Sequence, residues 1–421
     1  MRRACLLLVC GCAFAQTRLT LQDAEALAVK NHPAVSAALL NALAANQVTT
    51  EVRAAYFPTV TGSVTAAGAL EGTRLAAGSL NNPVIFNRFA TGASISQIIT
   101  DFGRTPNLVA QARHRAEAAQ SGAQATRAQV LLQVDRAYFT ALRTQNVLTV
   151  AQETVNARKL VSDQVSALAN SKLKSGLDVS FANVNLSEAK LLLVSAVNEA
   201  AAAMAELSDA LGYSGRQQFQ LADAPMPLDL TEDAAGLITE ALRNRPEVAQ
   251  FRAQQSAAES FARAERDLAR PTLSALAGLG VVPLRDETQL RGRYAAAGVN
   301  LNIPVFNGFL FSARRQEAEL RAQAAQKDVA GLENRVARDV EVALLNANTA
   351  RDRMSLTTEL LNEANQALDL AQTRYNLGLS SIVELSQAQL NKTSAEIASA
   401  AARYDYQLQR AVLSYQTGEL R

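Results

Sequence analysis

The chain has 421 residues with 41 basic and 39 acidic side chains, a formal net charge of +2 and no long basic run. This balance argues against a nucleic-acid partner, which would require a basic patch or stripe. Tryptophan is absent and aromatic residues make up 5% of the chain, while alanine, glutamine, asparagine and leucine fill long segments. Such a composition favours long packed helices over a compact aromatic core.

Residues 1–15 have the features of a signal peptide. Arg2 and Arg3 precede a short apolar stretch, and Ala13-Phe14-Ala15 matches an A-x-A cleavage pattern, so the mature chain is expected to begin at Gln16. An alternative is lipid attachment at Cys12, but cleavage after Ala15 is the better match. No disulfide is expected in the mature chain, because all three cysteines lie in this segment. Both alternatives place the protein outside the cytoplasm.

The rest of the sequence divides into two similar halves, residues 16–224 and 225–421, as in a tandem duplication. Matching positions in the two halves are separated by 213, 206 and 202 residues in turn: Pro33 and Pro246, Asp101 and Asn307, and Gly176 and Gly378. A change in loop length between the halves would account for the falling interval.

Each half is predicted to begin with a short helix (residues 21–31 and 237–244) and a second helix that ends before a proline. Two stretches with a period of two residues follow, as in Thr59-Val60-Thr61-Gly62-Ser63-Val64, which predicts four strands of about ten or more residues in the whole chain. Strands of that length can cross a hydrocarbon layer. No transmembrane helix is expected, because the mature sequence has no run of 18 apolar residues.

Long helical runs are predicted after the strands, over residues 104–174 and 312–377, each about 100 Å long at 1.5 Å per residue. Apolar residues recur in them every seven positions, which is typical of a coiled coil. Each run is expected to turn and to return as an antiparallel helix, over residues 178–211 and 382–415. The segment 212–236, which links the halves, is expected to be irregular.

The second of these turns has the clearest signals, in Arg374-Tyr375-Asn376-Leu377-Gly378-Leu379-Ser380-Ser381-Ile382-Val383-Glu384-Leu385. Gly378 follows the last periodic residue and is expected to end the helix in a left-handed conformation. Ser380 or Ser381 can cap the next helix, with Glu384 completing a capping box. A weaker copy, Lys172-Leu173-Lys174-Ser175-Gly176-Leu177-Asp178-Val179-Ser180, lies in the first half.

Four membrane strands cannot close a barrel, since about eight is the minimum. An open sheet in lipid would leave backbone groups unpaired, at several kcal/mol each. The chain is therefore expected to oligomerise, with eight strands from two copies or twelve from three.

The sequence resembles the TolC-type outer membrane efflux protein family over essentially the whole mature chain. The resemblance rests on the duplicated order of elements and on three segments: Ile303-Pro304-Val305-Phe306-Asn307-Gly308, Arg374-Tyr375-Asn376-Leu377-Gly378-Leu379 and Ala402-Arg403-Tyr404-Asp405-Tyr406. It implies a mixed α/β membrane protein: a homotrimer with four transmembrane strands per chain, a twelve-stranded β-barrel and a long antiparallel α-helical coiled-coil barrel. It also implies a place in the outer membrane lipid, extending into the periplasm, as the passive exit duct of a tripartite system. The partners would be a periplasmic membrane-fusion (adaptor) protein and, through it, an inner-membrane transporter.

The resemblance also implies two groups of site residues. The tips that dock the adaptor would comprise Gly176, Leu177, Gly378, Leu379 and Ser380, and the tunnel entrance would comprise Tyr375, Glu384 and Gln387. Tyr375 matches a hydrogen-bonding tyrosine of the family and Glu384 an acidic position, although Glu384 is equally well explained as a capping carboxylate. Gln387 and Ala182 stand where acidic residues are common, which puts strong cation selectivity in doubt.

Catalytic, cofactor and metal sites are not predicted. The chain has two histidines, His32 and His114, and neither has a partner at ligand spacing. No nucleophile elbow or phosphate-binding glycine loop is present in the sequence. Two alternatives to an efflux duct remain open: a periplasmic coiled-coil scaffold without a channel, and a type I protein-secretion duct.

Overall fold

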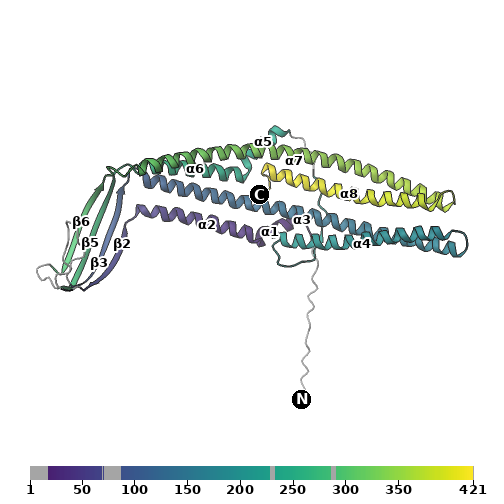
Figure 1. Cartoon of the computed structure of the whole chain (residues 1–421), viewed down its shortest axis with the longest axis horizontal. Helices are drawn as coiled ribbons and strands as arrows, with labels where there is room; N and C mark the ends of the chain where they lie inside the picture. Colours follow the sequence, from purple (N-terminus) through teal and green to yellow (C-terminus); the bar gives the residue numbers. More distant parts are fainter. Residues whose placement is uncertain (1–17, 69, 71–86, 228–232, 286–290, 421) are drawn as a thin grey trace, which may run out of the picture. The chain divides into compact units, whose positions relative to one another are not determined.

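The computed structural model describes residues 18–420 except 69, 71–86, 228–232 and 286–290 (Figure 1). The expected signal peptide, its cleavage after Ala15 and the alternative lipidation site Cys12 therefore lie outside the described residues. The chain forms two compact units, and each unit draws on both sequence halves. One comprises Met1–Ala38, Ala123–Pro246 and Glu333–Arg421, and the other comprises Leu39–Gly122 and Glu247–Leu332.

Four helices in each half have matching lengths. The first half contains α1 (Leu21–Asn31), α2 (Pro33–Arg53), α3 (Arg104–Asn170) and α4 (Gly176–Ala210). The second contains α5 (Ala234–Asn244), α6 (Pro246–Asp267), α7 (Leu310–Asn376) and α8 (Ile382–Thr417). The long helices α3 and α7 have 67 residues each, and both their first and their last residues are 206 positions apart. The expected fall of the interval to 202 residues is therefore wrong, because no length change occurs within the long helices.

The helix starts follow local chemistry. Thr20 caps α1, accepting from the Asp23 backbone N–H at 3.2 Å, and the Asp23 carboxylate lies 2.6 Å from the Thr20 hydroxyl. Pro33 and Pro246 are the first residues of α2 and α6, where the missing N–H of proline has no cost. Asp101 lies just before α3 and accepts from the Thr105 N–H at 2.7 Å.

The second unit contains an antiparallel sheet of four strands: β2 (Thr59–Ala67), β3 (Arg88–Thr100), β5 (Thr272–Arg285) and β6 (Arg293–Asn302). Their order is β2-β3-β5-β6, with α2 and α6 leading into the sheet and α3 and α7 leading out of it (Figure 1). The four strands predicted from the period of two are confirmed. The sheet lies at one end of the helices of this unit (Figure 1).

The strand register gives this sheet two chemically different faces. On one face, Thr61 lies opposite Ser94, and their hydroxyls are hydrogen-bonded at 2.8 Å. On the other, Val60 pairs with Ile95, and the row continues through alanines of β5 and β6. Large apolar side chains of this second face are exposed in the chain: Val60, Val64, Ile95, Leu279, Val299 and Leu301. We call the two sides the polar face and the apolar face.

The first unit contains a short parallel strand pair that the sequence analysis missed. β1 (Arg18–Leu19) pairs with β4 (Gln220–Leu221), within the segment expected to be irregular. The buried Tyr138 hydroxyl of α3 lies 2.8 Å from the Leu19 carbonyl oxygen and 2.6 Å from that of Ala222. A two-residue strand has too short a period to be visible in sequence, and here a tyrosine from a distant helix holds it in place.

One described helix, α4, is long and apolar enough to be a candidate membrane span by those two criteria alone, contrary to the expectation that none would be. Its apolar character comes from a coiled-coil seam, because alanines are buried in it every seventh residue: Ala182, Ala189, Ala196 and Ala203. The sequence search missed it by requiring an unbroken apolar run, whereas α4 has interspersed polar residues.

Candidate functional site

The turn between α7 and α8 is a Schellman motif. Gly378 has φ of +73°, its N–H donates to the Tyr375 carbonyl at 3.0 Å, and the Leu379 N–H donates to the Arg374 carbonyl at 2.8 Å. Ser381, one of the two serines expected to cap, is the N-cap of α8 and accepts from the Glu384 N–H. The predicted left-handed glycine is thus confirmed at Gly378, and no other heavy atom lies within 4 Å of the Cβ position there.

The turn between α3 and α4 has the same hydrogen bonds with a different residue at the left-handed position. Lys172 has φ of +60°, its N–H donates to the Ala169 carbonyl at 2.9 Å, and the Leu173 N–H donates to the Leu168 carbonyl at 2.9 Å. Gly176 is the first residue of α4 and is not left-handed. Its equivalence to Gly378 was therefore wrong, because Lys172 accepts the cost of the left-handed conformation.

The constant interval of 206 residues identifies the true counterparts at the two tips. Leu173 corresponds to Leu379, and their side chains are 71% and 68% exposed. Sequence reasoning missed Leu173 and chose Leu177, whose counterpart is Val383. Extending the interval found at Asp101 and Asn307 through both long helices would have identified it.

Tyr375 joins the two tips within the first unit. Its ring is 8% exposed and packs in a cluster with Val165 of α3, Ala182 of α4, and Ile382 and Leu385 of α8. The Lys174 Nζ, from the first tip, lies 4.3 Å from the ring centroid, which is the geometry of a cation–π contact. The expected hydrogen bond of the tyrosine is absent within the chain, since its buried hydroxyl has no partner among the described residues.

Acidic side chains at the two tips have different partners. In the first tip, Asp178 and Ser175 form a full capping box, and the hydrogen bonds from the Ser175 backbone N–H and hydroxyl lower the pKa of Asp178. In the second, the Glu384 carboxylate lies 3.3 Å from Arg374 Nε and does not reach back to the cap. Gln387 is exposed and donates to Asn391 at 2.9 Å.

A line of polar contacts holds α8 against the first hairpin. Asn185 of α4 donates to the Ser386 hydroxyl at 2.7 Å, and Arg158 of α3 donates to Gln389. Farther along α8, Asn146 of α3 donates to the Tyr404 hydroxyl at 2.7 Å. These contacts fix the register of α8, because each needs one residue of α8 opposite one residue of the other hairpin.

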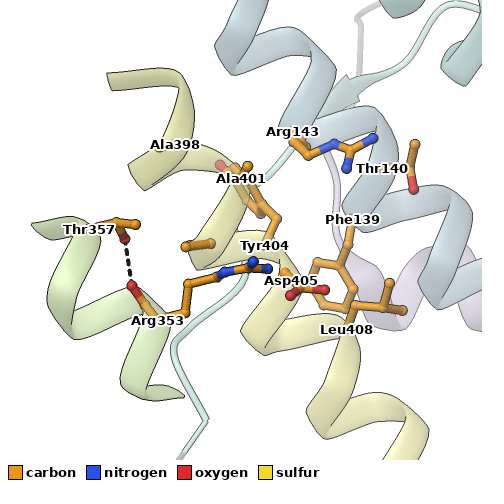
Figure 2. Close-up of a pocket in the computed structure, with 11 residues that line it drawn as sticks. Phe139, Thr140, Arg143, Arg353, Thr357, Ala398, Ala401, Tyr404, Asp405 and Leu408 are labelled. Carbon is orange, nitrogen blue, oxygen red and sulfur yellow. Dashed lines mark hydrogen bonds between the residues drawn. The ribbon is translucent and has the colours of Figure 1, made fainter. Parts of the chain in front are cut away.

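Figure 2 shows a crevice of about 420 Å³ in the first unit, between α3, α7 and α8. Its charged lining residues are Arg143, Arg353 and Asp405, and a hydrogen bond from the Thr357 hydroxyl to the Arg353 carbonyl closes one edge. The remaining lining is mostly alanine, leucine and aromatic. No nucleophile and base lie together among these residues, so the crevice has the character of a gap between packed helices.

A second cavity, of about 530 Å³, lies in the same unit beside a buried acid pair. Asp135 of α3 is 1% exposed, and burial raises its pKa to about 8, with a further contribution from the neighbouring Glu25 of α1. Burial also raises the pKa of Glu25. Among the described residues, no three His, Cys, Asp or Glu side chains gather as a metal site would require.

A family model for outer membrane efflux proteins matches residues 26–213 and 237–419. The chain belongs to the outer membrane efflux protein family. It is 25% identical over 387 residues to protein CyaE of Bordetella pertussis, covering 90% of this chain and 79% of CyaE. It is 24% identical over 339 residues to the outer membrane protein TolC of Escherichia coli (strain K12), covering 76% of this chain and 68% of TolC.

The fold agrees with this assignment. The crystal structure of the Neisseria gonorrhoeae MtrE outer membrane channel in its open state superposes with a TM-score of 0.78 at 19% identity, covering 94% of this chain and 88% of that one. This outer membrane efflux protein therefore has the fold of an outer-membrane channel, as the sequence resemblance implied. Its location is the outer membrane with an extension into the periplasm, which disfavours the alternative of a scaffold that never enters a membrane.

Proposed function

We propose that three copies of this outer membrane efflux protein form a passive exit duct, with a twelve-stranded β-barrel in the outer membrane and an α-helical tunnel in the periplasm. The hairpin tips dock a periplasmic adaptor protein, which links the duct to an inner-membrane transporter. The energy for export comes from that transporter, because this family is one of ducts and the chain itself supplies a path.

The two-faced sheet is the observation that carries this proposal. Its apolar face exposes valine, leucine and isoleucine side chains along all four strands, as expected of a surface in contact with lipid. The outer strands β2 and β6 each have one neighbour among the described strands. In lipid, every unpaired backbone group on these two edges would cost several kcal/mol, so the edges must pair with other copies.

Exposed apolar stripes on the helices support the same assembly. α4 exposes Phe181, Val184, Leu191 and Val194, and α7 exposes Leu356, Leu360, Leu370 and Leu377. Each stripe follows the three- and four-residue steps of a coiled-coil seam. A neighbouring copy that pairs α4 with α7 would bury both stripes.

The tips have the surface that a docking partner needs. Four leucines at the two turns are each about two-thirds exposed: Leu173, Leu177, Leu377 and Leu379. Gly176 and Gly378 have open space at their Cβ positions, so a partner backbone can come close to both. Ser380, with a buried hydroxyl that has no described partner, lies in the same turn as Gly378.

The deciding experiment is the mass of the particle extracted by detergent from isolated outer membranes, measured by light scattering with correction for bound detergent. The proposal expects three chains per particle. A monomer or dimer in the soluble periplasmic fraction would refute it, because two or four unclosed sheet edges are incompatible with a stable membrane barrel. Cross-linking through cysteines placed in β2 and β6 would then report which strand edges meet.

A further inference from the structure

The charges of the sheet are all of one sign and all at one end. β2, β3, β5 and β6 together contain three charged residues, Arg88, Arg285 and Arg293, and none is a carboxylate. Arg88 and Arg293 begin their strands and Arg285 ends its strand, so the three lie where the β2–β3 and β5–β6 connections turn. This end is opposite the end that leads into α3 and α7.

The register places two of these arginines side by side on the polar face. Arg88 is the direct cross-strand partner of Arg285. Arg88 alternates along β3 with the same period as Gly92, which pairs with Ser63 of the polar face. Arg293, in contrast, pairs with Val281 on the apolar face. The same sheet end thus provides a like-charged pair on one face and a single arginine on the other.

The Arg285 side chain has a defined position. Its Nη1 donates to the Val282 carbonyl at 3.1 Å, and a Cβ at Gly292 would lie 2.5 Å from that same Nη1. Only glycine at position 292 therefore leaves room for the guanidinium. The Nε of Arg285 is buried and has no hydrogen-bond partner among the described residues.

Two arginines directly opposite each other destabilise a sheet unless an anion lies between or beside them. A guanidinium group is planar and always charged, and it binds carboxylate or phosphate oxygens through two parallel hydrogen bonds. No carboxylate of the described residues is ion-paired with Arg88 or Arg285. An oxyanion from outside the chain fits both the charge and the hydrogen-bonding capacity of this pair.

We propose that Arg88 and Arg285 bind an oxyanion of the phosphate or carboxylate class, and that they form an anion-binding ring at the outer mouth of the duct. The inference rests on the proposed function in one respect, since the duct places the polar face toward the lumen and the strand connections outside the cell. Three chains contribute six arginines to the ring. Anionic solutes are then concentrated at the exit, whereas the inner entrance has Glu384.

The test uses the detergent-purified, full-length mature protein and inorganic phosphate as the probe. Calorimetric titration measures phosphate binding whether the inner entrance is open or closed, and planar-bilayer recording measures the block of conductance by phosphate added to either side. The variant is Arg88→Gln/Arg285→Gln. Its matched control is Arg293→Gln, which removes an arginine from the same end of the sheet but from the apolar face.

We expect the wild type and Arg293→Gln to bind phosphate alike, and the double variant to bind it about tenfold more weakly or worse, as loss of two charge-assisted contacts implies. Block is expected to be stronger from the side of the strand connections. Three results would overturn the inference: no phosphate binding by the wild type, as neutralisation by the nearby sequence positions Asp286 and Glu287 would produce; equal loss in Arg293→Gln; or an effect of the double variant seen only when anionic glycolipid is in the bilayer. A particle that is not a trimer would instead refute the duct itself.

Discussion

Gly418 packs against Arg245 with no space for a side chain, since a Cβ at Gly418 would lie 2.9 Å from the Arg245 backbone nitrogen. The first half repeats this contact, because a Cβ at Gly212 would lie 2.9 Å from the Asn31 carbonyl carbon. Both glycines are left-handed, with φ of +80° and +82°, and each ends the returning helix of its half. Each therefore joins the end of a returning helix to the break between two short helices.

Gly212→Ala and Gly418→Ala are each expected to lower the unfolding temperature. The left-handed conformation costs a non-glycine residue about 1–2 kcal/mol, and displacement of the packed backbone adds to it. The control is Gly331→Ala, which lies inside α7 with open space at its Cβ position and should raise stability by about 0.5–1 kcal/mol. Calorimetry of the detergent-solubilised protein measures all three, and no loss in the first two variants would contradict the packing argument.

Lys172→Gly is expected to stabilise the first tip by about 1 kcal/mol, because Lys172 has φ of +60° and glycine adopts this conformation without steric cost. Hydrogen exchange of the Lys172 and Leu173 amides, which donate the two Schellman hydrogen bonds, reports the local opening free energy. Ser171→Gly, one residue away and without positive φ, is the control. Faster exchange in Lys172→Gly would show that the left-handed conformation is not the source of strain.

Gly378→Arg is expected to leave the trimer intact but to abolish export. The Cβ position is open within the chain, so the arginine is accommodated, yet its side chain occupies the surface where the adaptor would dock. Gly378→Asn is the control, since asparagine tolerates the left-handed conformation and is small. Export by cells and particle mass are measured together. Normal export by an assembled Gly378→Arg trimer would remove Gly378 from the docking surface.

Tyr375→Phe is expected to preserve or slightly raise stability, because the buried hydroxyl has no hydrogen-bond partner among the described residues. Tyr375→Ala should cost about 3–5 kcal/mol, since the ring fills the contact between both hairpins. Thermal unfolding compares the two. If Tyr375→Phe alone changes channel opening in bilayer recordings, the hydroxyl has its partner in a neighbouring copy, as the family resemblance implies for this tyrosine.

Asp135→Asn is expected to stabilise the protein at alkaline pH and to have little effect at pH 5. Burial raises the pKa of Asp135 to about 8, so the folded state favours the protonated acid, and its contribution is lost as the pH rises through that value. Each unit of pKa shift corresponds to about 1.4 kcal/mol. Unfolding temperatures from pH 5 to 9 measure the difference, with the exposed Asp163→Asn in the same helix as control. A difference independent of pH would mean that Asp135 does not titrate in this range.

The sequence predicted the elements whose pattern extends over many residues. The alternation at Thr59 to Val64 and the proline pairs at an interval of 213 residues located the strands and the helices before them. Helix α5 begins at Ala234, three residues before the expected start, because Asp233 caps it through the Gly236 N–H. Boundaries of this kind depend on one capping side chain and are not set by the apolar period.

Features that depend on contacts between distant segments were not predictable. Tyr138 holds β1 and β4 through hydrogen bonds to residues 119 and 84 positions away, and neither strand has a pattern of its own. The left-handed Lys172 was hidden because glycine is the usual residue there, and Gly176 was nearby. Arg88 and Arg285 meet only through the strand register, which the sequence does not specify across a connection of unknown shape.

The matching turns at Lys172 and Gly378 have a consequence for the symmetry that a partner meets. In three copies, six turns have the same backbone hydrogen bonds, so a partner that recognises only the backbone finds six equivalent positions. The side chains differ between the two kinds of turn, so a partner that contacts lysine or serine finds three. A ring of partners can thus bind in two stoichiometries to one assembly, and the choice between them depends on side chains at the first tip.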